Sequence, residues 1–107
     1  MAKIKIKKSW ISKETMLRKL YLLLKEKPHI FHVVKLKGYT AGQCHVEIER
    51  IEIHPKYEVI SVLIHEVLHY YYPEWVEDVV LWHEAYFMKK LSARQLKNIL
   101  KRFAAIL

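Results

Sequence analysis

Apolar residues recur at helical spacing in several stretches of this chain, which predicts a largely helical second half. The expected helices span residues 12–27, 57–72, 75–90 and 92–106. Ser12 can cap the first helix, and Ser92 with Gln95 fits a capping box at the start of the last one. Pro28 and Pro73 end the first two helices, because a proline disfavours helical geometry in the residue before it.

Extended structure is expected in three stretches that alternate in polarity or are rich in β-branched and aromatic residues: 3–7, 29–37 and 44–53. The segment 38–42 contains both glycines of the chain and should form the turn of a hairpin between the second and third stretches. A slip in the alternation between Ile48 and Ile51 indicates a bend in the third. The predicted fold class is therefore α+β, with a small antiparallel sheet of about three strands, an N-terminal helix and three later helices.

Composition supports one packed domain over residues 1–107. Apolar residues make up 52% of the chain, which is too many for a disordered protein. The single cysteine, Cys44, cannot form an internal disulfide, which fits a reducing compartment. Residues 1–8 lack the apolar region of a signal peptide, and no apolar run approaches the length of a membrane span. We therefore expect a cytoplasmic location.

The formal net charge of +8 has two explanations. One is a nucleic-acid partner, which basic surfaces attract. The other is a solvated surface, because abundant Lys, Glu and Ile with scarce Gln and Asn is typical of proteins from hot environments. Charge by itself favours the solvated surface.

The stretch His65-Glu66-Val67-Leu68-His69 lies in the middle of the expected helix 57–72. Residues four apart share a helix face, so His65 and His69 can both direct a ring nitrogen at one zinc ion. Glu66 is rotated away from that face and is better placed to take a proton from a water molecule as general base. The alternative is that both histidines are structural, which a histidine-rich chain makes possible by chance. The apolar opposite face and the proline stop after His69 favour metal binding.

Catalytic zinc usually has three protein ligands, so a third must come from elsewhere. If the chain turns at residues 73–75 and a helix runs back, Glu77 in its first turn lies level with His69. Glu84 is on the same face two turns further along and is the alternative ligand. Asp78 and His83 should point elsewhere.

These residues resemble the gluzincin clan of zinc metallopeptidases. The pattern HExxHxxxPxxxExxV, filled here by His65 to His69, Pro73, Glu77 and Val80, is similar to that of small single-domain metallopeptidases, and the short chain is similar to the minigluzincins. The resemblance covers about residues 44–90. It implies a zinc-dependent endopeptidase with Glu66 as the catalytic base. The spacing from His69 to Glu77 is shorter than in thermolysin-like enzymes, and Glu84-Ala85 matches their glutamate–alanine pair instead.

In the clan an edge strand above the cleft binds extended substrate through main-chain hydrogen bonds, a mode that suits an exposed strand edge. The resemblance therefore makes the start of the strand 44–53 a substrate-binding segment. Its residues are Cys44, His45, Val46, Glu47 and Ile48. The amphipathic tail 91–107 is expected to contribute to dimerisation or to inhibit the enzyme, as in latent minigluzincin-like proteins.

Two other functions compete with a latent zinc endopeptidase. SprT-like proteases also carry HExxH, and some act on DNA-bound protein, but their third ligand is typically a histidine. A non-catalytic zinc-binding protein is the other possibility. Among the remaining residues, Tyr70, Tyr71 and Tyr72 can either donate a hydrogen bond to an oxyanion or pack, and packing is the commoner use. Trp75 and Trp82 are expected to pack between helices.

Overall fold

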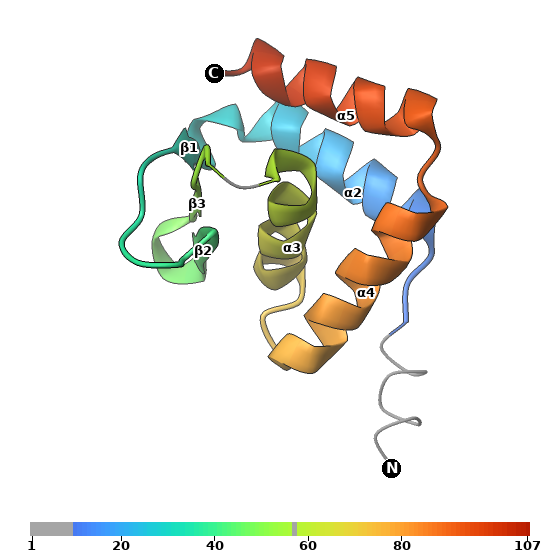
Figure 1. Cartoon of the computed structure of the whole chain (residues 1–107), viewed down its shortest axis with the longest axis horizontal. Coiled ribbons are helices and arrows are strands. Elements are labelled where there is room, and N and C mark those ends of the chain that lie inside the picture. Colours follow the sequence, from blue (N-terminus) through green and yellow to red (C-terminus); the bar gives the residue numbers. More distant parts are fainter. Residues whose placement is uncertain (1–9, 57) are drawn as a thin grey trace.

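The computed structural model describes residues 10–56 and 58–107, and the expected strand at 3–7 lies outside them. The fold is α+β, as predicted, with four helices and a three-stranded sheet among the described residues (Figure 1). The helices are α2 (Lys13–Glu26), α3 (Val59–Tyr71), α4 (Glu77–Lys90) and α5 (Ala93–Ala105). All four confirm expected helices to within a few residues at each end. None of them combines the length and apolar character needed to cross a membrane.

Local capping explains where two of the helices begin. The Ser12 hydroxyl accepts a hydrogen bond from the backbone N–H of Thr15 at 3.1 Å, so the predicted cap of α2 is present. At α5, Ser92 and Gln95 form both hydrogen bonds of the predicted capping box. These bonds satisfy backbone N–H groups that have no partner within the first helical turn.

The sheet is mixed, so the expected antiparallel hairpin between 29–37 and 44–53 is wrong. Its strands are β1 (Phe31–Val33), β2 (Gly42–His45) and β3 (Arg50–Ile53), in the order β1-β3-β2. β1 pairs with β3 in parallel, and β2 pairs with β3 antiparallel. The bend predicted near Ile48 is the cause, because it is sharp enough to reverse the chain.

That reversal consists of a short 3-10 helix, η2 (Val46–Ile48), followed by Glu49 in the left-handed region at φ 49°. The stretch 44–53 is therefore two strands with a turn between them. β2 and β3 form the hairpin, and β1 is left to join the other side of β3. This arrangement makes β2 an edge strand that lies beside α3, where Gly42 approaches Val62 and Glu66.

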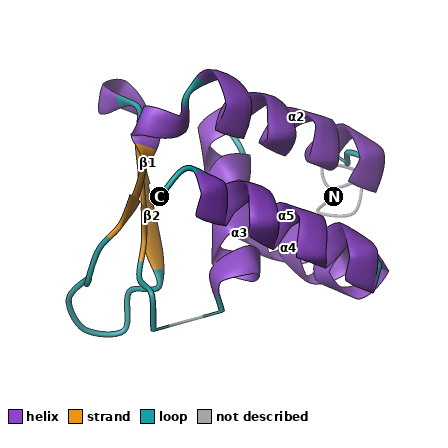
Figure 2. Ribbon diagram, turned by 90° about the horizontal axis from the view of Figure 1, so that it is seen from above, coloured by secondary structure: helices purple, strands orange, loops and turns teal. Residues whose placement is uncertain are grey.

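Helix α3 lies between the sheet and α4, while α2 and α5 pack against each other across one end of the molecule (Figures 1 and 2). The strand β3 and the helix α3 supply the centre of the core, where Ile51, Ile53, Leu63 and Ile64 are fully buried. Burial of these apolar side chains away from water fixes the helix against the sheet. The face of α3 that carries His65 is thereby held in one orientation.

The predicted tail, now helix α5, is part of this core. Ile99 is fully buried, and Phe103 packs edge-on against Phe31 of β1 at 5.9 Å between ring centroids. Leu100 and Leu107 remain 49% and 66% exposed. A role of these exposed residues in dimerisation, and a role of the tail in inhibition, stay predictions.

Candidate metal centre

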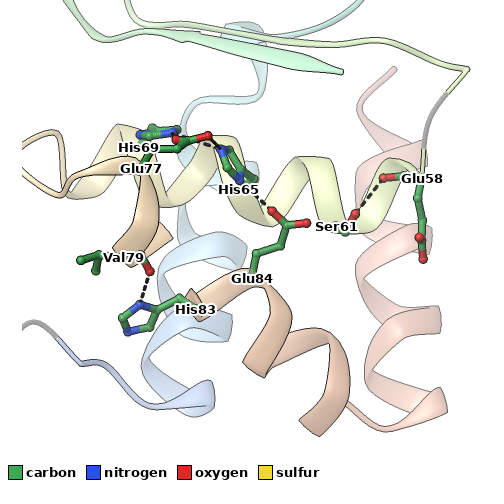
Figure 3. Close-up of polar contacts among 8 residues, drawn as sticks. All are labelled: Glu58, Ser61, His65, His69, Glu77, Val79, His83 and Glu84. Atoms are coloured by element: carbon green, nitrogen blue, oxygen red, sulfur yellow. Dashed lines mark hydrogen bonds and ion pairs between the residues drawn. The ribbon is translucent and has the colours of Figure 1, made fainter. Parts of the chain in front are cut away.

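His65 and His69 lie one turn apart on the same face of α3, as their spacing predicts. Their Nε2 atoms approach each other to 3.2 Å, and the rings stand edge to face (Figure 3). Neighbouring residues Leu63, Ile64, Val67 and Leu68 are buried, so the helix cannot rotate without exposing its core face. Packing thus fixes two imidazole nitrogens side by side at the surface of a cavity.

Glu77 closes the group from the first turn of α4. Its carboxylate lies 2.8 Å from Nε2 of His69 and 3.2 Å from Nε2 of His65. The chain reaches this position because it turns after Tyr72, with the N–H of Trp75 donating to the Tyr72 carbonyl at 3.0 Å. His65, His69 and Glu77 each bring one ligand atom to within 4.8 Å of the others, so the group could hold a metal ion.

Glu84 lies on the opposite side of the His65 ring. Its carboxylate is 2.7 Å from Nδ1 of His65, whereas Glu77 approaches Nε2 (Figure 3). Because a carboxylate can only accept, Nδ1 of His65 is the donor to Glu84, and a neutral His65 would then carry its lone pair on Nε2, on the side of Glu77 and His69. Of the two glutamates considered as third ligand, Glu77 joins the group and Glu84 orients one of its members.

Glu66 is buried beside this group, with 5% of its surface exposed. It lines the same cavity as His65, His69 and Glu77. Burial raises the pKa of its carboxyl to about 7, the charge of His65 opposes the rise, and the carboxylates of Glu77 and Glu84 add to it. A cation bound at the neighbouring group would lower that pKa again.

The electrostatics of His65 follow from the same carboxylates. Burial lowers its pKa, but the hydrogen bond to Glu84 and the charges of Glu66 and Glu77 raise it by more, so the net shift is upward. Three carboxylates, Glu47, Glu66 and Glu77, line the first cavity, and Glu84 lines the second, so the region is attractive to a cation.

The cavity has a volume of about 650 Å³ and lies between β2 and the His65 face of α3. Four of the five expected substrate-binding residues line it: Cys44, His45, Val46 and Glu47. Ile48 does not, and its side chain is 68% exposed. The expected strand also stops early, because only Cys44 and His45 of these five residues belong to β2.

A second cavity of about 320 Å³ lies on the other side of His65 and Glu66. It shares Gly42, His65, Glu66 and Glu77 with the first cavity. Its remaining lining is more apolar and comprises Thr40, Ala41, Val62, Leu81 and Glu84. The group of His65, His69 and Glu77 therefore lies where a polar cavity and a more apolar cavity meet.

Other candidate residues have structural roles. Burial raises the pKa of the Cys44 thiol to about 12, so it stays protonated and is a poor metal ligand. His83 is fully buried: Nδ1 donates to the Val79 carbonyl at 2.8 Å, and Nε2 accepts from the Ile11 N–H at 3.2 Å. It points away from the site, as expected (Figure 3).

The three tyrosines after the motif also have partners outside the site. The Tyr70 hydroxyl donates to Glu49 at 2.7 Å, and the Tyr71 hydroxyl donates to the Lys19 carbonyl at 3.0 Å. Tyr72 stacks on Trp75 with 4.1 Å between ring centroids. These contacts favour packing over oxyanion binding.

Sequence reasoning missed the role of Gly42, which it assigned to a turn. Gly42 is in β2, and a Cβ at this position would come within 2.7 Å of Val62 Cγ1 and 2.8 Å of Glu66 Oε2. Only a residue without a side chain lets the strand approach the helix this closely. A glycine at the start of an otherwise strand-like stretch was the signal that could have identified it.

A comparison of the chain with protein-family models, curated proteins and solved structures found no match. The chemistry of the site therefore has to be inferred from its own residues.

Proposed function

We propose that this chain is a zinc-dependent peptidase whose metal is held by His65, His69 and Glu77. The observation that carries the proposal is the convergence of three ligand atoms beside a buried carboxylate, Glu66, on the wall of a cavity. Two imidazoles and one carboxylate are a common ligand set of catalytic zinc, which keeps a further position open.

The separations of the ligand atoms, all within 4.8 Å of one another, are compatible with a bound zinc ion. Zinc bonds of about 2.0–2.1 Å at tetrahedral angles place neighbouring ligand atoms roughly 3.3 Å apart. The two Nε2 atoms are 3.2 Å apart. Oε1 of Glu77 lies 2.8 Å from Nε2 of His69, and Oε2 lies 3.2 Å from Nε2 of His65, so each nitrogen faces a different oxygen of the carboxylate. The donation from Nδ1 of His65 to Glu84 leaves the correct nitrogen free for a metal. A bound zinc ion would supply a Lewis acid for the carbonyl and a water molecule of lowered pKa.

The residues of the chain divide the remaining work. Glu66 is next to the ligand group but belongs to another face of α3, so its carboxylate is available to take a proton and to return it to a leaving amine. The edge strand β2 faces the same cavity and can pair with an extended peptide through main-chain hydrogen bonds. The two cavities would receive substrate side chains on either side of the cleaved peptide bond. The first cavity suits a polar side chain near His45 and Glu47, and the second suits an apolar side chain near Val62 and Leu81.

A metal site with a histidine as third ligand, which is typical of SprT-like proteases, is not supported. His83 is the one histidine of α4, and it is buried against Trp75 on another face of the helix. Dimerisation and latency through α5 remain part of the proposal, with the exposed Leu100 and Leu107 as the contact residues.

The test is hydrolysis of casein and of quenched-fluorescence peptides by zinc-loaded protein. We expect turnover that a chelator abolishes and zinc restores. Because a latent dimer would mask activity, the same assay is run on the double variant Leu100→Glu, Leu107→Glu, which removes the two exposed leucines of the tail 91–107. Absence of hydrolysis in both proteins, each with zinc bound, would contradict the proposed function and favour a non-catalytic zinc protein.

A further inference from the structure

An exposed row of aromatic rings lies on α4, the helix that also carries Glu77. Trp82 and Tyr86 are one turn apart and stack with 5.3 Å between ring centroids and 5° between planes. Trp10, just before α2, meets Tyr86 edge-on at 6.1 Å. Trp82 is 39% exposed and Trp10 43% exposed, so the expectation that Trp82 packs between helices is wrong.

Of the three tryptophans, Trp75 is part of the core, whereas Trp10 and Trp82 are largely outside it. Trp75 is buried, between Tyr72 at 4.1 Å and His83 at 4.5 Å. Trp82 touches the edge of His83 but keeps a large part of its surface in water. Large aromatic rings that remain in contact with water are typical of contact sites for other molecules.

Two lysines adjoin the row. The Lys90 ammonium lies 5.8 Å from the centroid of the Tyr86 ring, and the Lys13 ammonium donates to the Lys90 carbonyl at 3.5 Å. Among residues 10–56 and 58–107, no carboxylate lies within ion-pair distance of either ammonium. We call Trp10, Trp82, Tyr86, Lys13 and Lys90 the aromatic–lysine cluster.

The two ends of the aromatic–lysine cluster along α4 differ in charge. Asp78 lies one turn before Trp82 and is exposed, whereas Lys90 lies one turn after Tyr86. Positive charge is thus gathered at one end of the ring row and negative charge at the other. A ligand that suits it carries planar, uncharged groups that stack on Trp82 and anionic groups that lie near Lys13 and Lys90.

We propose that the aromatic–lysine cluster binds single-stranded nucleic acid. Unpaired bases stack on exposed aromatic rings regardless of sequence, and the phosphates pair with nearby ammonium groups. The net charge of +8 provides long-range attraction for such a polyanion. An anionic membrane would also attract lysines and tryptophans, but it would have to accommodate the Asp78 carboxylate next to the inserted ring, which is costly.

The proposal does not depend on the metal centre. No residue of the cluster lines either cavity or belongs to the group of His65, His69 and Glu77. Binding can therefore be measured whether or not the protein hydrolyses peptides, and failure of one proposal leaves the other standing.

The experiment titrates the intact chain with a fluorescent oligothymidylate of about 12 nucleotides at low salt, a length that exceeds the span of one stacking site. We expect binding that weakens steeply as salt rises. Trp82→Ala should lower the affinity roughly 5- to 100-fold, while Trp82→Tyr retains most of it because a tyrosine ring still stacks. Asp78→Asn should strengthen binding, since it removes a charge that repels phosphate.

The matched control separates stacking from bulk charge. The double variant Lys13→Gln, Lys90→Gln should weaken binding and reduce the salt slope by about two phosphate contacts. Lys25→Gln with Lys101→Gln removes the same charge from the far end of α2 and from α5, and should leave affinity nearly unchanged. Thermal unfolding of each variant verifies that it is folded.

Results of three kinds would overturn the proposal. The first is no binding of the oligonucleotide at low salt. The second is equal weakening by the two lysine pairs with no effect of Trp82→Ala, or equally tight binding of a duplex, either of which means attraction by charge alone. The third is a shift of tryptophan emission to shorter wavelength with vesicles of neutral and anionic phospholipid, together with no fluorescence change on adding the oligonucleotide, which would assign the cluster to a membrane surface.

Discussion

Glu84 and His65 form a hydrogen bond of 2.7 Å on the side of the imidazole ring that faces away from the other histidine. The two carboxylates of α4 thereby take different nitrogens of the same ring, with Glu77 on Nε2 and Glu84 on Nδ1. One glutamate can be a metal ligand while the other holds the tautomer that ligation requires. This division of roles gives the first prediction.

Glu84→Ala should weaken zinc binding roughly 10- to 100-fold without removing a ligand, because the His65 ring loses the group that orients it. Glu77→Ala should weaken zinc binding by more, since one of the ligand atoms is then missing. Both are measured by competition with a chromophoric chelator. Full occupancy of Glu77→Ala at limiting zinc, together with loss of zinc in Glu84→Ala, would make Glu84 the third ligand.

Gly42→Ala should reduce peptide hydrolysis and leave zinc affinity close to that of the wild type. The added methyl group would collide with Val62 and Glu66, so either β2 moves outward or the Glu66 carboxylate shifts. Such overpacking costs about 1–3 kcal/mol of the free energy of unfolding. Urea unfolding and turnover are measured together.

Gly38→Ala is the matched control for that substitution. Gly38 has φ of +63°, but nothing lies within 4 Å of a Cβ built there. It should lose about 1 kcal/mol of stability through backbone strain alone and keep its turnover. Equal loss of activity in both variants would refute a specific role of Gly42 at Glu66.

Tyr70→Phe separates packing from catalysis at the residue that follows His69. The Tyr70 hydroxyl bonds Glu49, the residue that ends η2, and Lys27 also pairs with Glu49. We expect only a small loss of stability, because the hydrogen bond to Glu49 is exposed to water, and little change in kcat. A fall in kcat of about 100-fold or more would instead identify Tyr70 as a donor to the oxyanion.

The burial of His83 should make the free energy of unfolding depend on pH. Burial lowers its pKa below about 6.5, the value expected in the unfolded chain, while its hydrogen bond to Val79 opposes this. Between the two pKa values the unfolded chain binds more protons, so the free energy of unfolding should fall as pH drops from about 6.5 towards the lower value. Its ring meets Trp75, Trp82 and Phe87, which are uncharged.

The measurement is urea unfolding of metal-free protein between acid and neutral pH, for the wild type and for His83→Gln. The variant should be less stable at neutral pH but should lose less stability on acidification. Parallel pH profiles for the two proteins would show that His83 does not titrate in this range. The comparison cancels contributions of the other histidines, which both proteins contain.

The helices could be predicted because their signals are local. Ser12, Ser92 and Gln95 act within one turn of themselves, and the spacing of His65 and His69 fixes their common face wherever the helix lies. The pairing of the strands could not be predicted, because it depends on a turn at Glu49 in the left-handed region, which a glutamate rarely adopts. The same limit applies at Gly42, whose role depends on how closely β2 approaches α3.

The third metal ligand could be predicted only in part. Glu77 and Glu84 share a helix face, so the sequence favoured Glu77, which should lie level with His69, but kept Glu84 as the alternative. The assignment needs the angle at which α4 returns from Trp75, which tertiary packing sets. The exposure of Trp82 was missed for a related reason. Tryptophan side chains are usually buried, and the exposure of this one depends on how the helices pack against each other.

The most direct test of the account compares zinc content and peptide hydrolysis in wild type and Glu66→Gln, purified side by side. Glutamine keeps the shape of the buried side chain but cannot accept a proton as a carboxylate does. We predict one zinc ion in each protein and a loss of hydrolysis of roughly 100-fold or more in the variant, as removal of a general base requires. Equal hydrolysis by the two zinc-loaded proteins, or absence of zinc from the wild type, would contradict the account.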